Sequence, residues 1–121
     1  MMTVYQDLDQ QFIHGQWQHG TSTKIIKNIN PFTQTEIMSL AAASSVDVDS
    51  AYTAAEQAFQ QGVLNSIGVR KTVLQNLINI IQQRRAEIID WLIIESGSTR
   101  IKAGLEMDAA LGIIQESLAF P

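Results

Sequence analysis

The hydrophobic pattern of the chain changes its period near residue 44. Residues 12–43 alternate short apolar runs with turn residues, whereas residues 44–120 repeat apolar side chains every three or four positions. The first pattern predicts strands and the second predicts helices. Strands followed by helices indicate an α+β fragment, in which a small N-terminal antiparallel β unit precedes three α-helices.

Glycine and proline divide the strand region. His14-Gly15 predicts a tight turn within residues 12–17, because glycine adopts a positive φ without steric cost. Residues 24–29 are apolar and β-branched, and Asn30-Pro31 ends this strand because proline has no N–H to donate. Residues 36–41 are expected to return as its partner. Two strands are marginal in water, so this hairpin-like unit must pack against something else.

Helix signals begin at Ser44, which forms a capping box with Asp47. Gly62 is a suitable C-terminal residue for that first helix. A longer second helix is expected over residues 66–95, and Ser96-Gly97 ends it.

A third helix follows, with Ser98 or Thr99 as its cap, and stops at Phe120-Pro121. We therefore divide the chain into a polar arm (residues 1–11), the β unit (12–43) and a three-helix region (44–121). A proline directly after a helix is usually followed by more chain, so we expect the native chain to continue past Pro121.

Composition excludes several classes of function. The chain has no cysteine, which rules out disulfides, thiolate metal sites and a cysteine nucleophile within these residues. A net charge of -4 makes nucleic acid an unfavourable partner. No apolar run approaches the roughly 20 residues that span a bilayer, and the first eleven residues do not resemble a secretory signal. We expect a cytoplasmic protein without a membrane or nucleic-acid partner.

The residues alone indicate no active site. There is no glycine-rich phosphate loop, and His14 and His19 lack a third metal ligand. A serine nucleophile needs a base held by a third group, and no histidine lies in the helical region. Helix capping is therefore the better account of the hydroxyls there, Ser96, Ser98 and Thr99. Three carboxylates lie around the same turn: Glu95, Glu106 and Asp108.

Six motifs, in this order and spacing, resemble the opening of an aldehyde dehydrogenase. They are Phe12–Trp17 (family FI-G-W), Asn28–Thr33 (NPxT), Ser45–Ala51 (xxDVDxAV), Ala54–Phe59 (AAxxAF), Val69–Leu74 (ERxxxL) and Glu95–Ser98 (ExGK). The chain departs from the family where Gln34 replaces a glycine, where a tryptophan is missing near Val63-Leu64, and where Ser98 replaces a lysine. The run Glu95–Thr99, with Lys102-Ala103, Glu106 and Phe120-Pro121, is similar to the benzaldehyde and vanillin dehydrogenase branch.

This resemblance implies an NAD(P)-dependent enzyme that oxidises an aldehyde, here an aromatic one, to a carboxylic acid through a cysteine thioester. The family's cysteine, oxyanion-stabilising asparagine and glutamate base lie in later motifs, and NAD or NADP binds a sheet that follows this segment. We expect these residues to be a structural and inactive part of the NAD(P)-binding domain, with no catalytic or cofactor-binding residue. The full-length protein is expected to be a homo-oligomer.

The resemblance also implies a cation site. Some family members hold a monovalent cation with backbone carbonyls just before the Asn-Pro turn and a carboxylate just before the later glycine. The matching residues are Asn28, Ile29 and Glu95. Hard cations favour oxygen ligands. The alternative is that Glu95 faces water or caps a neighbouring element.

Two other functions compete with the dehydrogenase fragment. A non-catalytic helical interaction module would use its apolar helix faces to bind a partner, and would melt cooperatively on its own. An independent enzyme of this length is disfavoured because the chain offers no credible nucleophile–base pair.

Overall fold

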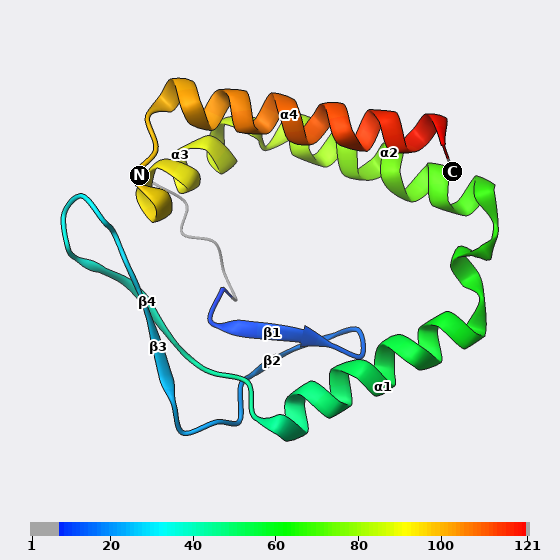
Figure 1. The fold of residues 1–121 in the computed structure, drawn as a ribbon, viewed down its shortest axis with the longest axis horizontal. Coiled ribbons are helices and arrows are strands. Elements are labelled where there is room, and N and C mark those ends of the chain that lie inside the picture. Colours follow the sequence, from blue (N-terminus) through cyan, green and yellow to red (C-terminus); the bar gives the residue numbers. More distant parts are fainter. Residues whose placement is uncertain (1–7, 121) are drawn as a thin grey trace. The chain divides into compact units, whose positions relative to one another are not determined.

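The computed structural model describes residues 8–120, which form two compact units (Figure 1). The first unit ends at Gly62 and the second begins at Val63. Within the described residues there are four strands, four α-helices and one 3-10 turn. The predicted fold class, small antiparallel sheets followed by helices, is confirmed.

The first sheet pairs β1 (Gln10–Ile13) with β2 (Gln16–His19) in antiparallel fashion. His14 and Gly15 connect them with φ values of 56° and 76°, as a two-residue hairpin turn requires. The strand includes Gln10 and Gln11, which polarity alone assigns to the N-terminal arm. The β unit therefore begins at Gln10 rather than at residue 12. The turn sets the register of the two strands, and in this register their pairing continues to Gln10 opposite His19. The rest of the arm, residues 1–7, lies outside the described residues.

The second sheet pairs β3 (Ile25–Ile29) with β4 (Glu36–Ala41), close to both predicted strands. The register shifts between Asn28 and Ile29, so an irregularity interrupts the ladder just before the Asn30 turn. Such a shift locally disrupts the pairing of backbone groups.

Helix α1 (Ser45–Gln61) has the predicted capping box at Ser44 and Asp47 and the predicted glycine end at Gly62, whose φ is 68°. Its helical sequence pattern places it in the predicted three-helix region, but in the structure it belongs to the first unit together with the strands. The reason is a tertiary contact, since Asp47 binds the Thr21 loop that follows β2.

The second unit contains η1 (Val63–Asn65), α2 (Ile67–Gln83), α3 (Arg85–Ser96) and α4 (Arg100–Ala119). The single helix predicted over residues 66–95 is therefore wrong: it breaks at Arg84, where φ is -99° and ψ is 10°. No glycine or proline marks this break. Ile81 and Ile88 lie seven positions apart, and that apolar spacing does not distinguish a continuous helix from one interrupted at a single residue.

The core of the second unit is small. Ile89, Ala103 and Met107 are buried, and four partly buried side chains pack against them: Ile81, Ile88, Leu92 and Ile93. Helix α4 lies alongside α2 (Figure 1) and also packs on α3. Across residues 8–120, none of the helices combines the length and apolar character needed to cross a bilayer.

Candidate functional site

The residues predicted to hold a cation lie in different units. Asn28 and Ile29 are in β3 of the first unit, at its register shift, and Glu95 is in the last turn of α3 in the second unit. Gly97 follows Glu95 with a left-handed φ of 69° and ends the helix. The cation site itself stays a prediction.

The Asn30 turn explains the NPxT motif physically. The Asn30 side-chain oxygen accepts hydrogen bonds from the backbone amides of Phe32 (2.9 Å) and Thr33 (3.1 Å). The Asn30 backbone carbonyl accepts one from the Gln34 backbone amide. Gln34 has a φ of 59°, a left-handed conformation that favours glycine. The Gln34 amide side chain donates to the Pro31 carbonyl at 2.7 Å, which partly compensates for the missing glycine.

The start of α1 is tied to the loop after β2 through one carboxylate. Asp47 Oδ2 accepts from the amides of Ser44 and Thr21 and from the Thr21 hydroxyl, each at 2.8 Å. Asp47 is only 6% exposed. Hydrogen bonds from the Ser44 amide, then the Thr21 amide, hold the pKa of Asp47 well below its usual range. Asp47, which belongs to the xxDVDxAV motif, therefore stabilises the junction between the loop after β2 and α1.

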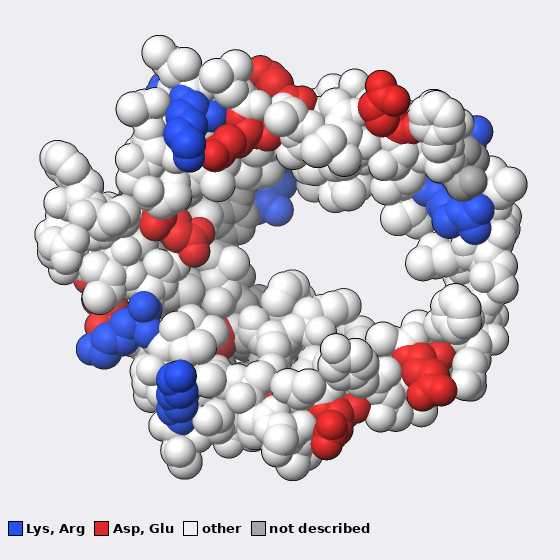
Figure 2. All heavy atoms as spheres, viewed as in Figure 1, with Lys and Arg blue, Asp and Glu red and all other residues white. Residues whose placement is uncertain are grey.

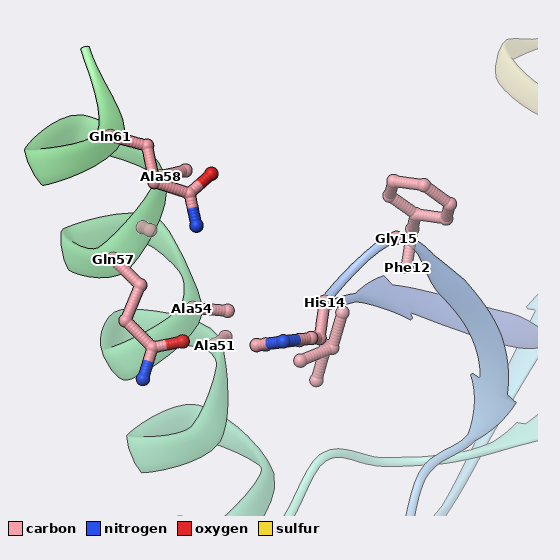
Figure 3. Close-up of a pocket in the computed structure, with 10 residues that line it drawn as sticks. Phe12, His14, Gly15, Ala51, Ala54, Gln57, Ala58 and Gln61 are labelled. Atoms are coloured by element: carbon pink, nitrogen blue, oxygen red, sulfur yellow. The ribbon is translucent and has the colours of Figure 1, made fainter. Parts of the chain in front are cut away.

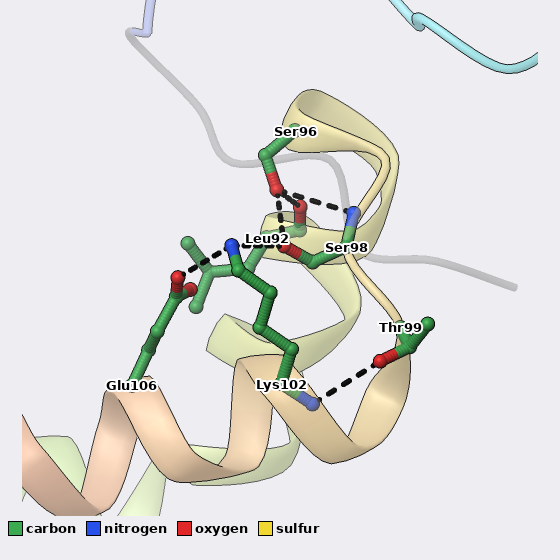
Figure 4. Close-up of polar contacts among 6 residues, drawn as sticks. All are labelled: Leu92, Ser96, Ser98, Thr99, Lys102 and Glu106. Atoms are coloured by element: carbon green, nitrogen blue, oxygen red, sulfur yellow. Dashed lines mark hydrogen bonds and ion pairs between the residues drawn. The ribbon is translucent and has the colours of Figure 1, made fainter.

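The turn between α3 and α4 gathers the hydroxyls noted in the sequence (Figure 4). Thr99 is the N-cap of α4 and accepts from the Lys102 amide. Ser96 Oγ donates to the Leu92 carbonyl at 2.6 Å, and Ser98 Oγ lies 2.8 Å from Ser96 Oγ. Capping is confirmed for Thr99, and the two serines form a hydroxyl chain that leads to a carbonyl of the last turn of α3.

Lys102 completes this chain and was missed by sequence reasoning. Its ammonium donates to Ser98 Oγ at 3.2 Å and to Glu106 Oε1 at 2.7 Å. A serine–lysine pair can act as nucleophile and base, but a base must be uncharged. Here the lysine nitrogen donates to both Ser98 and Glu106, so it does not accept a proton from Ser98. The spacing of Ser98 and Lys102, four residues apart across a helix start, could have indicated the contact.

An open groove of about 380 Å³ lies in the first unit between the β1–β2 turn and α1 (Figure 3). His14 and Phe12 form one side, and the alanines of α1 form the other, with Gln57 and Gln61 at the border. The alanine methyl groups opposite His14 offer neither a metal ligand nor an acid–base group. The groove is an apolar surface rather than a reaction site.

Among residues 8–120, neither unit shows a recognisable catalytic constellation. The sequence has no cysteine, and the part of the chain that the structure describes holds no group of three potential metal-binding side chains. Lysine, arginine and carboxylate side chains are dispersed over the face drawn in Figure 2, with uncharged surface between them. The contacts described above cap helices and close turns.

The family profile and the most similar sequences point to the same protein family. The sequence profile of the aldehyde dehydrogenase family matches residues 17–120. A vanillin dehydrogenase from Corynebacterium glutamicum is 40% identical over 115 residues, which cover 95% of this chain and 24% of that protein. The benzaldehyde dehydrogenase YfmT of Bacillus subtilis is 35% identical over 120 residues, covering 99% of this chain and 25% of the relative.

A solved structure matches this chain in fold as well as in sequence. The crystal structure of an NAD-dependent benzaldehyde dehydrogenase from Corynebacterium glutamicum superposes with a TM-score of 0.89 and 40% identity, over 93% of this chain and 25% of that one. The chain thus spans about a quarter of the length of the relatives that it matches. The match is to their N-terminal part.

Proposed function

Because the chain belongs to the aldehyde dehydrogenase family, we propose that it is the N-terminal, structural part of an enzyme that oxidises an aldehyde with NAD or NADP. The observation that carries the proposal is the combined match of sequence and fold over nearly the whole chain and only a quarter of each relative. Its own residues then position helices and turns, and the reacting groups belong to the rest of the enzyme.

The proposed reaction joins an aldehyde, water and oxidised cofactor to give a carboxylic acid, reduced cofactor and a proton. A cysteine thiolate outside these residues would add to the carbonyl, hydride would pass to NAD(P)+, and water would release the acid from the thioester. Vanillin and benzaldehyde, the aldehydes in the relatives' names, make an aromatic aldehyde the proposed substrate. The NAD-dependent relative supports NAD as the cofactor.

The assignment of a structural role follows from the contacts of the motif residues. Asn30 closes a turn, Asp47 ties a loop to α1, and Arg70 donates from Nη1 to the carbonyls of Leu64 (2.6 Å) and Asn65 (3.1 Å). The arginine of the ERxxxL motif thus holds η1 against the start of α2. We expect the complete enzyme to be a cytoplasmic homo-oligomer.

A segment exchange tests this function. The matched N-terminal part of the Corynebacterium glutamicum vanillin dehydrogenase is replaced with this chain, and formation of reduced cofactor from vanillin is followed by absorbance. We expect the exchange enzyme to oxidise vanillin and the 121-residue chain alone to show no turnover. The same exchange into YfmT, assayed with benzaldehyde, controls for mismatched contacts with one host. Inactivity of both exchange enzymes beside active parents would contradict the proposal, as would turnover by the chain alone.

A further inference from the structure

The last turn of α3 carries negative charge and has no cation of its own. The carbonyl end of a helix is equivalent to roughly half a negative elementary charge, and basic side chains in the last turn stabilise it. In α3 the last turn contains Glu95 and no basic residue. A cation supplied by another element would therefore stabilise this helix end.

Helix α4 begins with cations whose sign is unfavourable for α4 itself. Arg100 and Lys102 lie in its first turn, which contains no acidic residue, although the amide end of a helix favours negative charge. Arg100 reaches back to Asp90 of α3 at 2.6 Å. The sign of these two charges therefore suits the end of α3 rather than the start of α4.

Lys102 contacts the end of α3 through two hydroxyl groups (Figure 4). Its Nζ donates to Ser98 Oγ at 3.2 Å. Ser98 Oγ lies 2.8 Å from Ser96 Oγ, which also donates to the Leu92 carbonyl. Ser98 is only 9% exposed, so water competes little for its hydroxyl. Because Ser98 stands at the position of the motif lysine, the structure brings an ammonium to that position from four residues further along the chain.

We infer that Lys102 caps the end of α3 from the following helix and replaces the lysine that is missing at position 98. Its ammonium opposes the negative end of α3, and the Glu106 carboxylate, 2.7 Å from its nitrogen, holds it beside Ser98. The turn between the two helices is then closed by charge as well as by the left-handed conformation of Gly97. This role involves the second unit alone and is independent of the proposed reaction.

The test follows hydrogen exchange of the Gly97 amide, which donates to the Ile93 carbonyl and closes α3, in the full 121-residue chain. Lys102→Met is compared with Glu106→Gln. Both variants lose the ion pair, but only Lys102→Met loses the ammonium at Ser98. We expect about threefold faster exchange of the Gly97 amide in Lys102→Met and the parent rate in Glu106→Gln. Equal rates in the two variants would overturn the inference.

Two further measurements separate charge from packing. Lys102→Arg keeps the positive charge and should retain the parent rate at Gly97, whereas exchange as fast as in Lys102→Met would overturn the inference. The Lys102 side chain is 63% exposed, so about 1 M salt should shrink the difference between Lys102→Met and the parent by screening the charge. A difference that salt leaves unchanged would assign the effect to lost packing and overturn the inference too.

Discussion

At the scale of the residue, Gln34 shows how a departure from the family pattern is accommodated. Its φ of 59° is the conformation for which the family uses glycine, and a side chain there costs roughly 1 kcal/mol. Gln34→Gly removes that strain but also the 2.7 Å hydrogen bond to Pro31. We expect a net gain of about 0.5 kcal/mol, measured as roughly twofold slower exchange of the Asn30 and Thr33 amides, which are hydrogen-bonded within the turn, in the exchange enzyme. Faster exchange than in the parent would show that the hydrogen bond outweighs the strain.

Asp47 makes a prediction about pH. Its folded-state pKa lies below the unfolded value, so the stabilisation it provides is present above about pH 4 and is lost as the pH falls further. The amide resonances of Ser44 and Thr21 should therefore stay constant down to about pH 4 and move only below it. A titration midpoint at or above the ordinary value would contradict the hydrogen-bond geometry. Asp47→Asn should abolish the transition.

Ser44 tests the capping box separately from the charge. Ser44→Ala removes the side-chain acceptor for the Asp47 amide and should destabilise α1 by about 1 kcal/mol, seen as faster exchange of its first-turn amides. Ser45→Ala, one position along, is the control and should have little effect. Equal exchange in the two variants would show that the cap is not formed. Sequence alone predicted this cap because its spacing is local, but it missed Thr21 as a partner, 26 positions from Asp47.

At the scale of the element, Arg85 links α3 to α4. Arg85 binds Asp108 at 2.8 Å and the Gly104 carbonyl at 3.2 Å, whereas Arg84, at the break before α3, pairs with Glu87 three residues along the chain. Arg85→Ala should therefore destabilise the α3–α4 packing by about 1 kcal/mol. Arg84→Ala should change it by less than about 0.5 kcal/mol. Amide exchange of residues 85–107 in the exchange enzyme measures both, and a larger effect at Arg84 would contradict this assignment.

Element boundaries followed the sequence where a local signal exists. Gly62 and Gly97 both adopt the left-handed conformation expected at helix ends, and the strands begin and end close to their turn residues. The break at Arg84 had no such signal, since no glycine or proline lies there. The candidate cation residues came from family resemblance, and neither periodicity nor spacing could supply them. The four-residue spacing of Ser98 and Lys102 could indicate their contact, but the apolar pattern used to predict the helices does not include these polar residues.

At the scale of the whole molecule, both units leave large apolar side chains exposed. Phe59, Ile101 and Phe120 are each about 80% exposed. The proposed function accounts for this exposure, because the rest of the enzyme would cover these side chains.

The most direct measurement of this structural role compares amide hydrogen exchange in the isolated chain with exchange in the same residues of the segment-exchange enzyme. If the rest of the enzyme covers these units, the amides of α1 and α4 should become at least about a hundredfold better protected in the enzyme, because local opening then exposes an interface as well as a helix. Equal protection in both settings would mean that the units are complete by themselves, and would contradict the account.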